Sequence, residues 1–231
     1  MPMDLRSIME HLGRMGNPED LDGMERFGIP RAGNLGVRVP ELRRLARRIG
    51  IDSGLAEALW NLGYRETRLL ASMVQDPKTL EEGRLEAWLK DFDSWEITDG
   101  TILNCFWKHP AAHRKALEWS RREREFEKRA GFVMMAILAV KDKGLPDFEF
   151  NPFLVAVARE AGDERNFVKK AISWALRQIG KRNALLNKAA IGVGEELKKS
   201  ENRAARWIAS DALRELQSTG VRKRVRVWKR V

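Results

Sequence analysis

A short helical motif recurs five times along the chain and constrains its fold more than any other feature. Each copy is a polar residue followed by small and apolar residues: Arg68-LLASMV, Asp99-GTILNCF, Arg129-AGFVMMAIL, Lys170-AISWALRQI and Arg206-WIASDAL. Successive copies begin 31, 30, 41 and 36 residues apart. One helical hairpin per interval of this length is typical of α-solenoids of the HEAT or armadillo type. Equivalent helices line one inner surface of such a stack, so the five polar residues are candidates for lining it.

Helical periodicity also dominates the remainder of the chain. Pro40 precedes a periodic run that stops at Gly50, and Ser94 and Ser200 precede two other runs, as is typical of helix ends. Strand-like alternation is confined to residues 37–39 and the charged C-terminus. We therefore expect an all-α fold, a solenoid of about six antiparallel helix pairs. The predicted helices span residues 3–14, 40–49, 53–62, 64–75, 78–90, 95–107, 110–120, 123–141, 147–161, 164–180, 183–198 and 200–217.

Positive charge is concentrated in the second part of the chain. Residues 1–100 carry 14 Lys and Arg against 18 Asp and Glu, whereas residues 101–231 carry 29 against 15. The two net charges, −4 and +14, make up the overall +10. A surface this basic is typical of nucleic-acid binding. We expect one domain over residues 1–220 with a basic concave face. A basic tail follows over residues 221–231, either solvated or gripping a DNA strand.

The sequence lacks the features of a membrane-spanning, a secreted, a disulfide-bonded or a metal-binding protein. The longest apolar run, 130–140, has 11 residues, fewer than the ~20 of a membrane-spanning helix. The N-terminus lacks the apolar core of a signal peptide. Cys105 is the only cysteine, which excludes an internal disulfide and a thiolate metal cluster. His109 and His113 flank Pro110, so no metal site is expected. The sequence predicts a cytoplasmic, monomeric protein without a metal or cofactor.

The predicted helix 164–180 combines an apolar face with a basic face that carries a tryptophan. The basic face holds Lys170, Trp174, Arg177 and Lys181. Interleaved aromatic and cationic side chains can stack on nucleotides while they neutralise phosphates. The alternative is that a neighbouring repeat covers Trp174.

Two charged residues fall among apolar neighbours. Trp95 and Asp99 are four residues apart and therefore share one face of the predicted helix 95–107. Arg129 has apolar neighbours on its own face of helix 123–141. A charge in such a position is costly unless it is paired or lines a cleft. Two interpretations stay open: a buried Asp99–Arg129 ion pair that only fixes helix register, or an active cleft with one acid, one guanidinium and two indoles.

The chemistry open to such a cleft is narrow. A lone carboxylate beside aromatic walls can stabilise a developing cation and orient water. No Ser, Cys or His stands near Asp99 for a triad, no second acid is spaced for two-carboxylate glycoside hydrolysis, and no Gly-rich phosphate loop occurs. These residues favour action on a cationic or cation-generating group in DNA over a triad hydrolase, a two-carboxylate glycoside hydrolase or a kinase.

Six segments together resemble the HEAT-like-repeat DNA alkylation repair glycosylases, the AlkD family. The resemblance runs from about Gly36 to Leu216. The segments are GVRVPELRRLARRIG (36–50), YRETRLLASMV (64–74), DSWEITDGTILNCF (93–106), FEKRAGFVMMAILAV (126–140), ERNFVKKAISWALRQIGKRN (164–183) and RAARWIASDALREL (203–216).

The resemblance implies a C-shaped solenoid that holds duplex DNA in a basic groove. It implies hydrolysis of the N-glycosidic bond of cationic alkylpurines, such as N3-methyladenine and N7-methylguanine, without base flipping. The family's WxxxD motif falls on Trp95 and Asp99, its arginine on Arg129, and its KAIxWALR tryptophan on Trp174. Asp99 would then stabilise oxocarbenium character and position water. The two tryptophans would pack on the sugar–phosphate, and Arg129 would hold the local phosphate.

Further DNA contacts are expected from the polar residues that begin the copies of the motif and from the basic face of the predicted helix 164–180. These residues are Lys170, Arg177, Lys181, Arg182, Arg206 and Arg68. The family's third aromatic, a tyrosine near the N-terminus, has no match because Tyr64 lies elsewhere, and Phe27 is the candidate replacement. Glu96 stands where aspartate is commoner, a harmless change if it faces solvent. Two other functions stay open: a non-catalytic DNA-binding protein of the same fold, and a protein-interaction scaffold.

Overall fold

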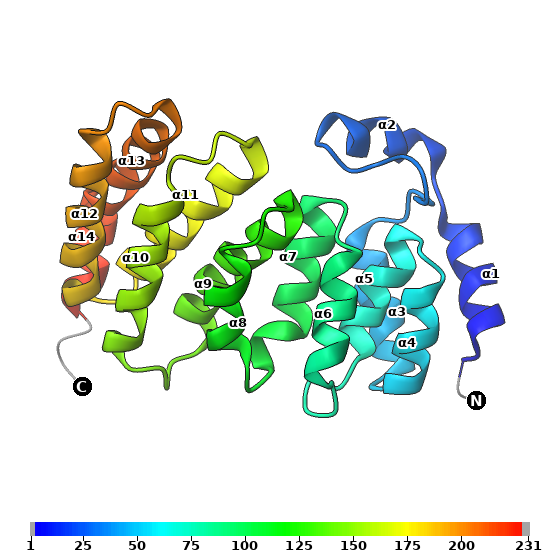
Figure 1. Ribbon diagram of the computed structural model, residues 1–231. Coiled ribbons are helices and arrows are strands. Elements are labelled where there is room, and N and C mark those ends of the chain that lie inside the picture. The colour runs from blue at the N-terminus through cyan, green and yellow to red at the C-terminus, as the bar shows by residue number, and fades with distance from the viewer. Residues whose placement is uncertain (1–2, 228–231) are drawn as a thin grey trace. The chain divides into compact units, whose positions relative to one another are not determined.

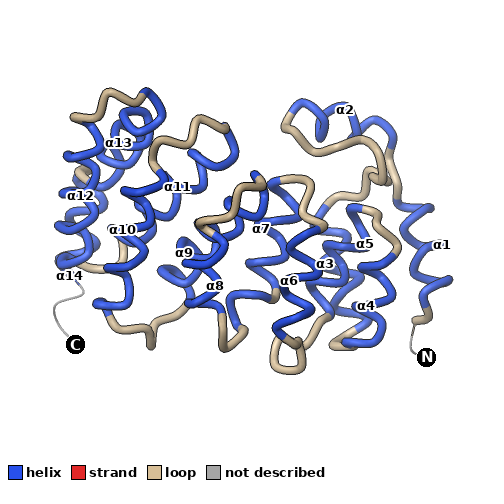
Figure 2. The backbone as a smooth tube through the Cα atoms, in the orientation of Figure 1, coloured by secondary structure: helices blue, strands red, loops and turns tan. Residues whose placement is uncertain are grey.

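The computed structural model, which describes residues 3–227, consists of helices joined by loops and turns (Figure 2). Across that range there are fourteen α-helices, two short 3-10 helices and no strand, which confirms the all-α prediction. Of residues 37–39, where the sequence alternates, the first two lie in a loop and Val39 begins a helix. Within the described residues, no helix is both long enough and apolar enough to cross a membrane.

The chain divides into two compact units, Met1–Pro110 and Ala111–Val231. The helices of the first unit are α1 (Leu5–Met15), α2 (Pro18–Arg26), α3 (Val39–Ile49), α4 (Ser53–Asn61), α5 (Arg65–Val74), α6 (Glu82–Lys90), α7 (Trp95–Asn104) and η1 (Phe106–Lys108). Those of the second unit are α8 (Ala112–Trp119), α9 (Glu125–Lys141), η2 (Asp147–Phe150), α10 (Asn151–Glu160), α11 (Asn166–Gly180), α12 (Ala184–Lys198), α13 (Arg203–Leu216) and α14 (Thr219–Val227) (Figure 1). The single domain over residues 1–220 and its concave face stay predictions.

In the first unit, α5 lies between α3 and α7 and packs against both. The core of this unit is aromatic: the rings of Trp60 on α4 and Trp88 on α6 are parallel, with centroids 4.1 Å apart. Trp60 Nε1 donates to the Asp91 carboxylate at 2.8 Å, which satisfies the polar end of this buried side chain. Cys105 is fully buried, and burial raises the pKa of its thiol to about 12.

In the second unit, α9 and α11 are neighbours, as are α11 and α13. Helix α9 is apolar on almost every side and is nearly entirely buried, as expected of a central helix. It approaches α8 closely at Gly131, where a Cβ would lie 2.3 Å from the Ser120 backbone nitrogen. Any side chain at this position would push the two helices apart.

The sequence signals for helix ends are confirmed in three of four places. Pro40 lies in the first turn of α3, and Gly50 ends that helix with a φ of +80°, a conformation that favours glycine. Ser94 caps α7 by accepting from the Ile97 N–H. Ser200 does not cap α13, because Asn202 does so instead and the helix begins at Arg203.

Two helices are additional to the twelve predicted. Helix α2 contains no buried residue, so it lacks the apolar periodicity on which the prediction relied. Helix α14 occupies most of the segment expected as a basic tail. There Val221 and Val225, four residues apart, are buried on one helical face. Residues 228–231, including Trp228, lie outside the described residues.

Candidate active site and nucleic-acid interface

The candidate site of the first unit begins at the N-terminus of α7. Trp95 is the first residue of this helix, directly after the Ser94 cap. Its indole Nε1 donates a 2.8 Å hydrogen bond to the backbone carbonyl of Phe27, which follows α2. The Phe27 ring itself is 73% exposed. A backbone contact therefore positions the half-buried indole, while a second aromatic ring remains available to a ligand.

Trp95 and Phe27 line a common pocket of about 400 Å³. Its other walls are Asp20, Gly23, Met24, Ile29 and Arg38. Two hydrogen bonds, of 2.8 and 2.7 Å, join the Arg38 guanidinium to the Asp20 carboxylate and connect α2 to the start of α3. The candidate third aromatic thus shares a pocket with the tryptophan of the WxxxD motif.

Asp99 lies one helical turn after Trp95 and is half-buried. The face that they share continues to Leu103, which is 36% exposed, whereas Ile102 beside it is buried. Asp99 therefore lies at the border between the core and the surface, where a carboxylate can meet both a ligand and the protein.

A buried charge network supports the start of α7. Arg65 hydrogen-bonds both carboxylate oxygens of Glu96, at 2.5 and 2.9 Å, and its Nη1 lies 2.8 Å from Glu66 Oε1. Glu66, with no exposed surface, also accepts from the backbone N–H groups of Leu35 and Val37 at 3.0 Å. Burial lowers the pKa of Arg65, but its hydrogen bonds to Glu96 and its proximity to Glu66 outweigh burial and raise it.

This network links three parts of the first unit: the loop before α3, the first turn of α5 and the first turn of α7. The Glu96 side chain does not face solvent, since only 16% of it is exposed. Arg65 and Glu66 could not be recognised as supporting residues from the sequence, because adjacent charges at a helix start usually face water.

Arg129 is the corresponding charged residue of the second unit. It lies on α9, is 6% exposed and donates from Nη1 to the backbone carbonyl of Phe167 at 2.6 Å. Phe167 also contacts the ring of Phe126 on α9, with centroids 5.6 Å apart. The guanidinium thus joins α9 to the first turn of α11, the helix that carries Trp174.

Trp174 is half-buried at the middle of α11. With the Gln178 amide oriented so that its oxygen faces donors, that oxygen accepts from Trp174 Nε1 at 2.9 Å and from Lys181 Nζ at 3.1 Å. The indole therefore has a polar partner on its own helix, one turn away. Neighbouring helices leave part of its ring uncovered.

The four predicted catalytic residues fall into two pairs. Trp95 and Asp99 share one turn of α7 in the first unit, whereas Arg129 and Trp174 lie on the adjacent helices α9 and α11 in the second. The gathering of all four in one cleft stays a prediction. The Asp99–Arg129 ion pair likewise stays an open interpretation.

Three side-chain contacts connect α11 to α13, each between residues that are 38 positions apart in the sequence. Lys169 Nζ lies 5.1 Å from the ring centroid of Trp207, Ser173 Oγ lies 2.6 Å from Asp211 Oδ2, and Arg177 Nη1 lies 2.7 Å from Glu215 Oε2. Lys181 Nζ contacts the other Glu215 oxygen at 2.5 Å. Burial raises the pKa of Glu215, but its hydrogen bonds to Lys181 and Arg177 outweigh burial and lower it.

The predicted DNA-binding residues differ in what they already contact. Lys170 is exposed, and Arg206 is exposed while donating to the carbonyl groups of Ser200 and Glu201. Trp207, next to Arg206, is 38% exposed and was missed by the sequence analysis. The available signal was its position directly after Arg206, the polar residue that begins the last copy of the motif. Together Lys169, Lys170, Arg206 and Trp207 form a basic and aromatic surface on α11 and α13.

Arg182 and Arg68 are mainly engaged with the protein. The Arg182 side chain is 9% exposed and bonds carbonyl groups of the loop after α9, among them Asp142 at 2.7 Å and Leu145 at 2.6 Å. Arg68 bonds the Asp91 carbonyl and the Asp93 carboxylate, each at 3.1 Å. These contacts order loops, and the DNA-binding role of both residues stays a prediction.

In the comparison with known protein families, residues 8–216 match the model described as DNA alkylation repair enzyme. The chain belongs to this family. Comparison with curated proteins gives no match. The DNA alkylation repair family model covers every helix from α3 to α13, and so every residue of both candidate pairs.

A solved structure agrees with this assignment at the level of the fold. It is described as a member of a new family of proteins related to the HEAT-like repeat DNA glycosylases with affinity for branched DNA structures. The TM-score is 0.77 at 20% sequence identity, covering 93% of this chain and 96% of that one. The HEAT-like repeat fold predicted from the motif spacing is thereby confirmed.

Proposed function

We propose that this protein is a monofunctional DNA glycosylase that removes cationic alkylpurines, of the N3-methyladenine and N7-methylguanine type, from duplex DNA without flipping the base. The observation that supports it best is the presentation of Trp95 and Asp99 on one turn of α7. There the indole is fixed through the Phe27 carbonyl and the carboxylate lies at the border of the core. Both residues belong to the stretch that matches the repair family.

The reaction requires little from the protein because the substrate is already activated. The bond between C1′ and the purine nitrogen breaks, and its electron pair neutralises the positive charge of the base. Positive charge then develops on the deoxyribose, where the Asp99 carboxylate would stabilise it. Water attacks C1′, and its proton passes to Asp99 or to solvent. No general acid is needed, since the leaving base is neutral once the bond has broken.

The remaining residues would hold the lesion strand. An aromatic quadrupole is negative at the ring face, so the faces of Trp95, Trp174 and the exposed Phe27 would favour a neighbouring cation. Arg129 would bind the phosphate beside the lesion, and the surface formed by Lys169, Lys170, Arg206 and Trp207 would bind the backbone further along. Such a protein would act as a monomer in the cytoplasm, on nucleoid DNA.

A second candidate is a non-catalytic protein that binds branched DNA. The observation that favours it is the description of the solved relative with the same fold, together with the absence of a matching N-terminal tyrosine. It would use the same basic surface without breaking a bond.

Base release from methylated duplex distinguishes the two. The protein is incubated in excess with a duplex that contains N7-methylguanine, and free base is measured against the spontaneous rate. We expect release well above that rate. Duplex binding without accelerated release would contradict the proposal and support the binding protein.

A further inference from the structure

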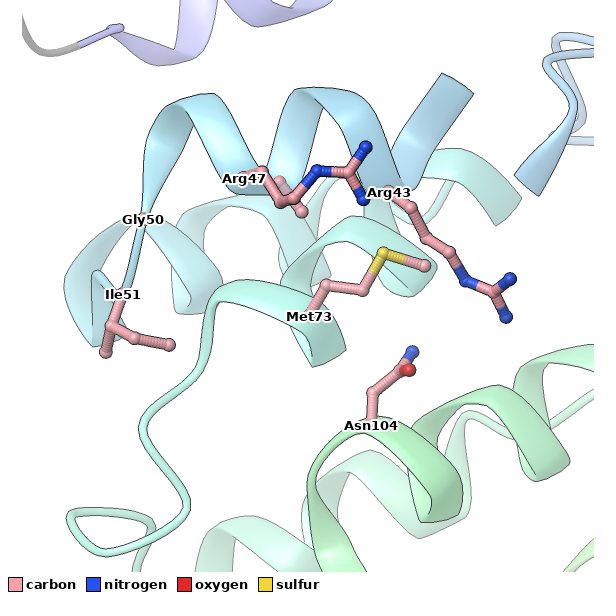
Figure 3. A pocket seen from close by; sticks show the side chains of 7 residues that line it. Arg43, Arg47, Gly50, Ile51, Met73 and Asn104 are labelled. Carbon is pink, nitrogen blue, oxygen red and sulfur yellow. The ribbon is translucent and has the colours of Figure 1, made fainter. Parts of the chain in front are cut away.

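A second pocket of about 400 Å³ opens in the first unit, on a part of α3, α5 and α7 that the proposed reaction does not use. Arg43, Ala46 and Arg47 line it from α3, Met73 from α5 and Asn104 from α7, with Gly50 and Ile51 at one end. In Figure 3 the two arginines extend along the opening above Met73, and the Asn104 amide points toward Met73 from the facing helix.

The two arginines of this pocket have no charge partner of their own. Both are exposed, and neither guanidinium makes a hydrogen bond or an ion pair with another residue within 3–227. The adjacent Arg44 differs, since it pairs with Glu41. Two unpaired guanidiniums one helical turn apart attract an anion, and the flat, forked guanidinium is well suited to phosphate.

The floor of the pocket is apolar, which a site for phosphate alone does not require. Met73 and Ala46 form it, and Ile51 beside them is 66% exposed. Exposed apolar side chains in a concave site are typical of ligand pockets, and a volume of about 400 Å³ lies within their usual range. The ligand should therefore have an apolar, flat part as well as negative charge.

Asn104 adds one directional polar group. Its Nδ2 donates to Ser72 Oγ at 2.9 Å, which fixes the amide and leaves Oδ1 as an acceptor. An amino group on the edge of a nucleobase is a donor that matches it. Asn104 follows Asp99 by five residues, roughly 7.5 Å along the helix axis, and it faces α5.

We propose that this pocket binds one unpaired nucleotide of a DNA strand. The base lies on Met73 and Ala46 with its edge at Asn104, and flanking phosphates bind Arg43 and Arg47. A fully paired duplex keeps its bases stacked inside and presents mainly phosphates to a surface, so only an unpaired nucleotide uses both the charged and the apolar parts. The inference rests on DNA binding in the proposed function, but not on base excision.

The test uses three fluorescein-labelled duplexes of one sequence: fully paired, with a single unpaired dA, and with an abasic unpaired position. Affinities are compared for the full-length protein, for R43Q/R47Q and for R44Q/R48Q. The last variant is a matched control, because it removes the same charge from the same helix at positions outside the pocket. We expect the wild type to prefer the unpaired dA duplex by about tenfold. The control should keep this preference, whereas R43Q/R47Q and the abasic duplex should lose it.

Salt dependence separates a lost phosphate contact from misfolding. On the dA duplex, R43Q/R47Q should reduce the slope of log K against log salt by about 1.4, the value for two single-strand phosphates. Equal affinity of the wild type for paired and unpaired duplexes overturns the proposal. An equal loss of the preference for unpaired dA in both double variants also overturns it. Competition by free dAMP, without a preference among the duplexes, assigns the pocket to a mononucleotide and also overturns it.

Base release by the wild type from paired methylated duplex is measured in parallel. A preference for the unpaired dA without any base release would reject the proposed glycosylase and leave the pocket intact. Base release without the preference would reject the proposed nucleotide pocket and support the glycosylase.

Discussion

The indole Nε1 of Trp95 is bound to the backbone carbonyl of Phe27, 68 residues earlier in the chain, at 2.8 Å. This contact brings an exposed phenyl ring to the helix turn that also carries Asp99. Because the main chain of Phe27 makes the contact, the ring is not needed to hold Trp95. The ring can therefore be removed without disturbing the indole.

Replacing Phe27 by alanine should slow base release while leaving the fold intact. The ring is exposed, so the free energy of unfolding should change by no more than about 0.5 kcal/mol. Loss of one aromatic contact to DNA should reduce the single-turnover rate roughly tenfold. Stability is measured by urea unfolding and activity with methylated duplex. An unchanged rate would remove Phe27 from the site, and Phe148, exposed in the second unit, provides the control position.

Glu66→Gln should destabilise the first unit strongly. The carboxylate is fully buried and accepts from two backbone N–H groups as well as from Arg65, so its loss leaves a buried guanidinium undercompensated. Breaking a buried pair of this kind costs about 3 kcal/mol or more. Asp22→Asn, at an exposed ion pair with Arg31, should cost less than about 1 kcal/mol. Chemical unfolding of both variants measures the difference, and equal effects would refute the role of the network.

The link from α11 to α13 through Glu215 should weaken in acid. Hydrogen bonds to Lys181 and Arg177 outweigh the effect of burial and lower the pKa of Glu215 below the ordinary value of a glutamate, 4.5. The native state therefore favours the ionised form. Its contribution is complete well above pH 4.5 and is lost as pH falls through the lower, native pKa. The melting temperature of the wild type should exceed that of Glu215→Gln at pH 7, and the gap should narrow below pH 4.5. A gap independent of pH would contradict this account.

The helices were largely predictable because their signals are local. Pro40, Ser94 and Gly50 mark helix ends through their own backbone and side-chain chemistry, and the structure has helix ends there. Helix α2 escaped prediction because it buries nothing, and α14 because the many Arg and Lys residues of this segment suggest a basic tail. Burial of Val221 and Val225, four residues apart, decides for the helix, and it depends on packing that the sequence alone does not reveal.

The candidate site was predictable in its residue types but not in its supports. The spacing of Trp95 and Asp99 places both on one helical face, as is found. Nothing local indicates that Glu96 binds Arg65, 31 residues earlier, or that Phe27 reaches Trp95. Such contacts depend on how the loop before α3 folds back on α5 and α7. The same holds for Lys169 and Trp207, which only the packing of α11 against α13 brings together.

In the proposed function, the Asp99 carboxylate promotes rupture of the glycosidic bond. The most direct measurement is single-turnover release of N7-methylguanine by wild type and by Asp99→Asn, which keeps size and hydrogen bonding but removes the charge. Glu81→Gln, at an exposed position before α6, removes one charge from the same unit as a control. We expect Asp99→Asn to be slower by about 10²-fold or more, the cost of one key electrostatic group, and the control to match wild type. Equal rates for wild type and Asp99→Asn, with equal duplex binding, would contradict it.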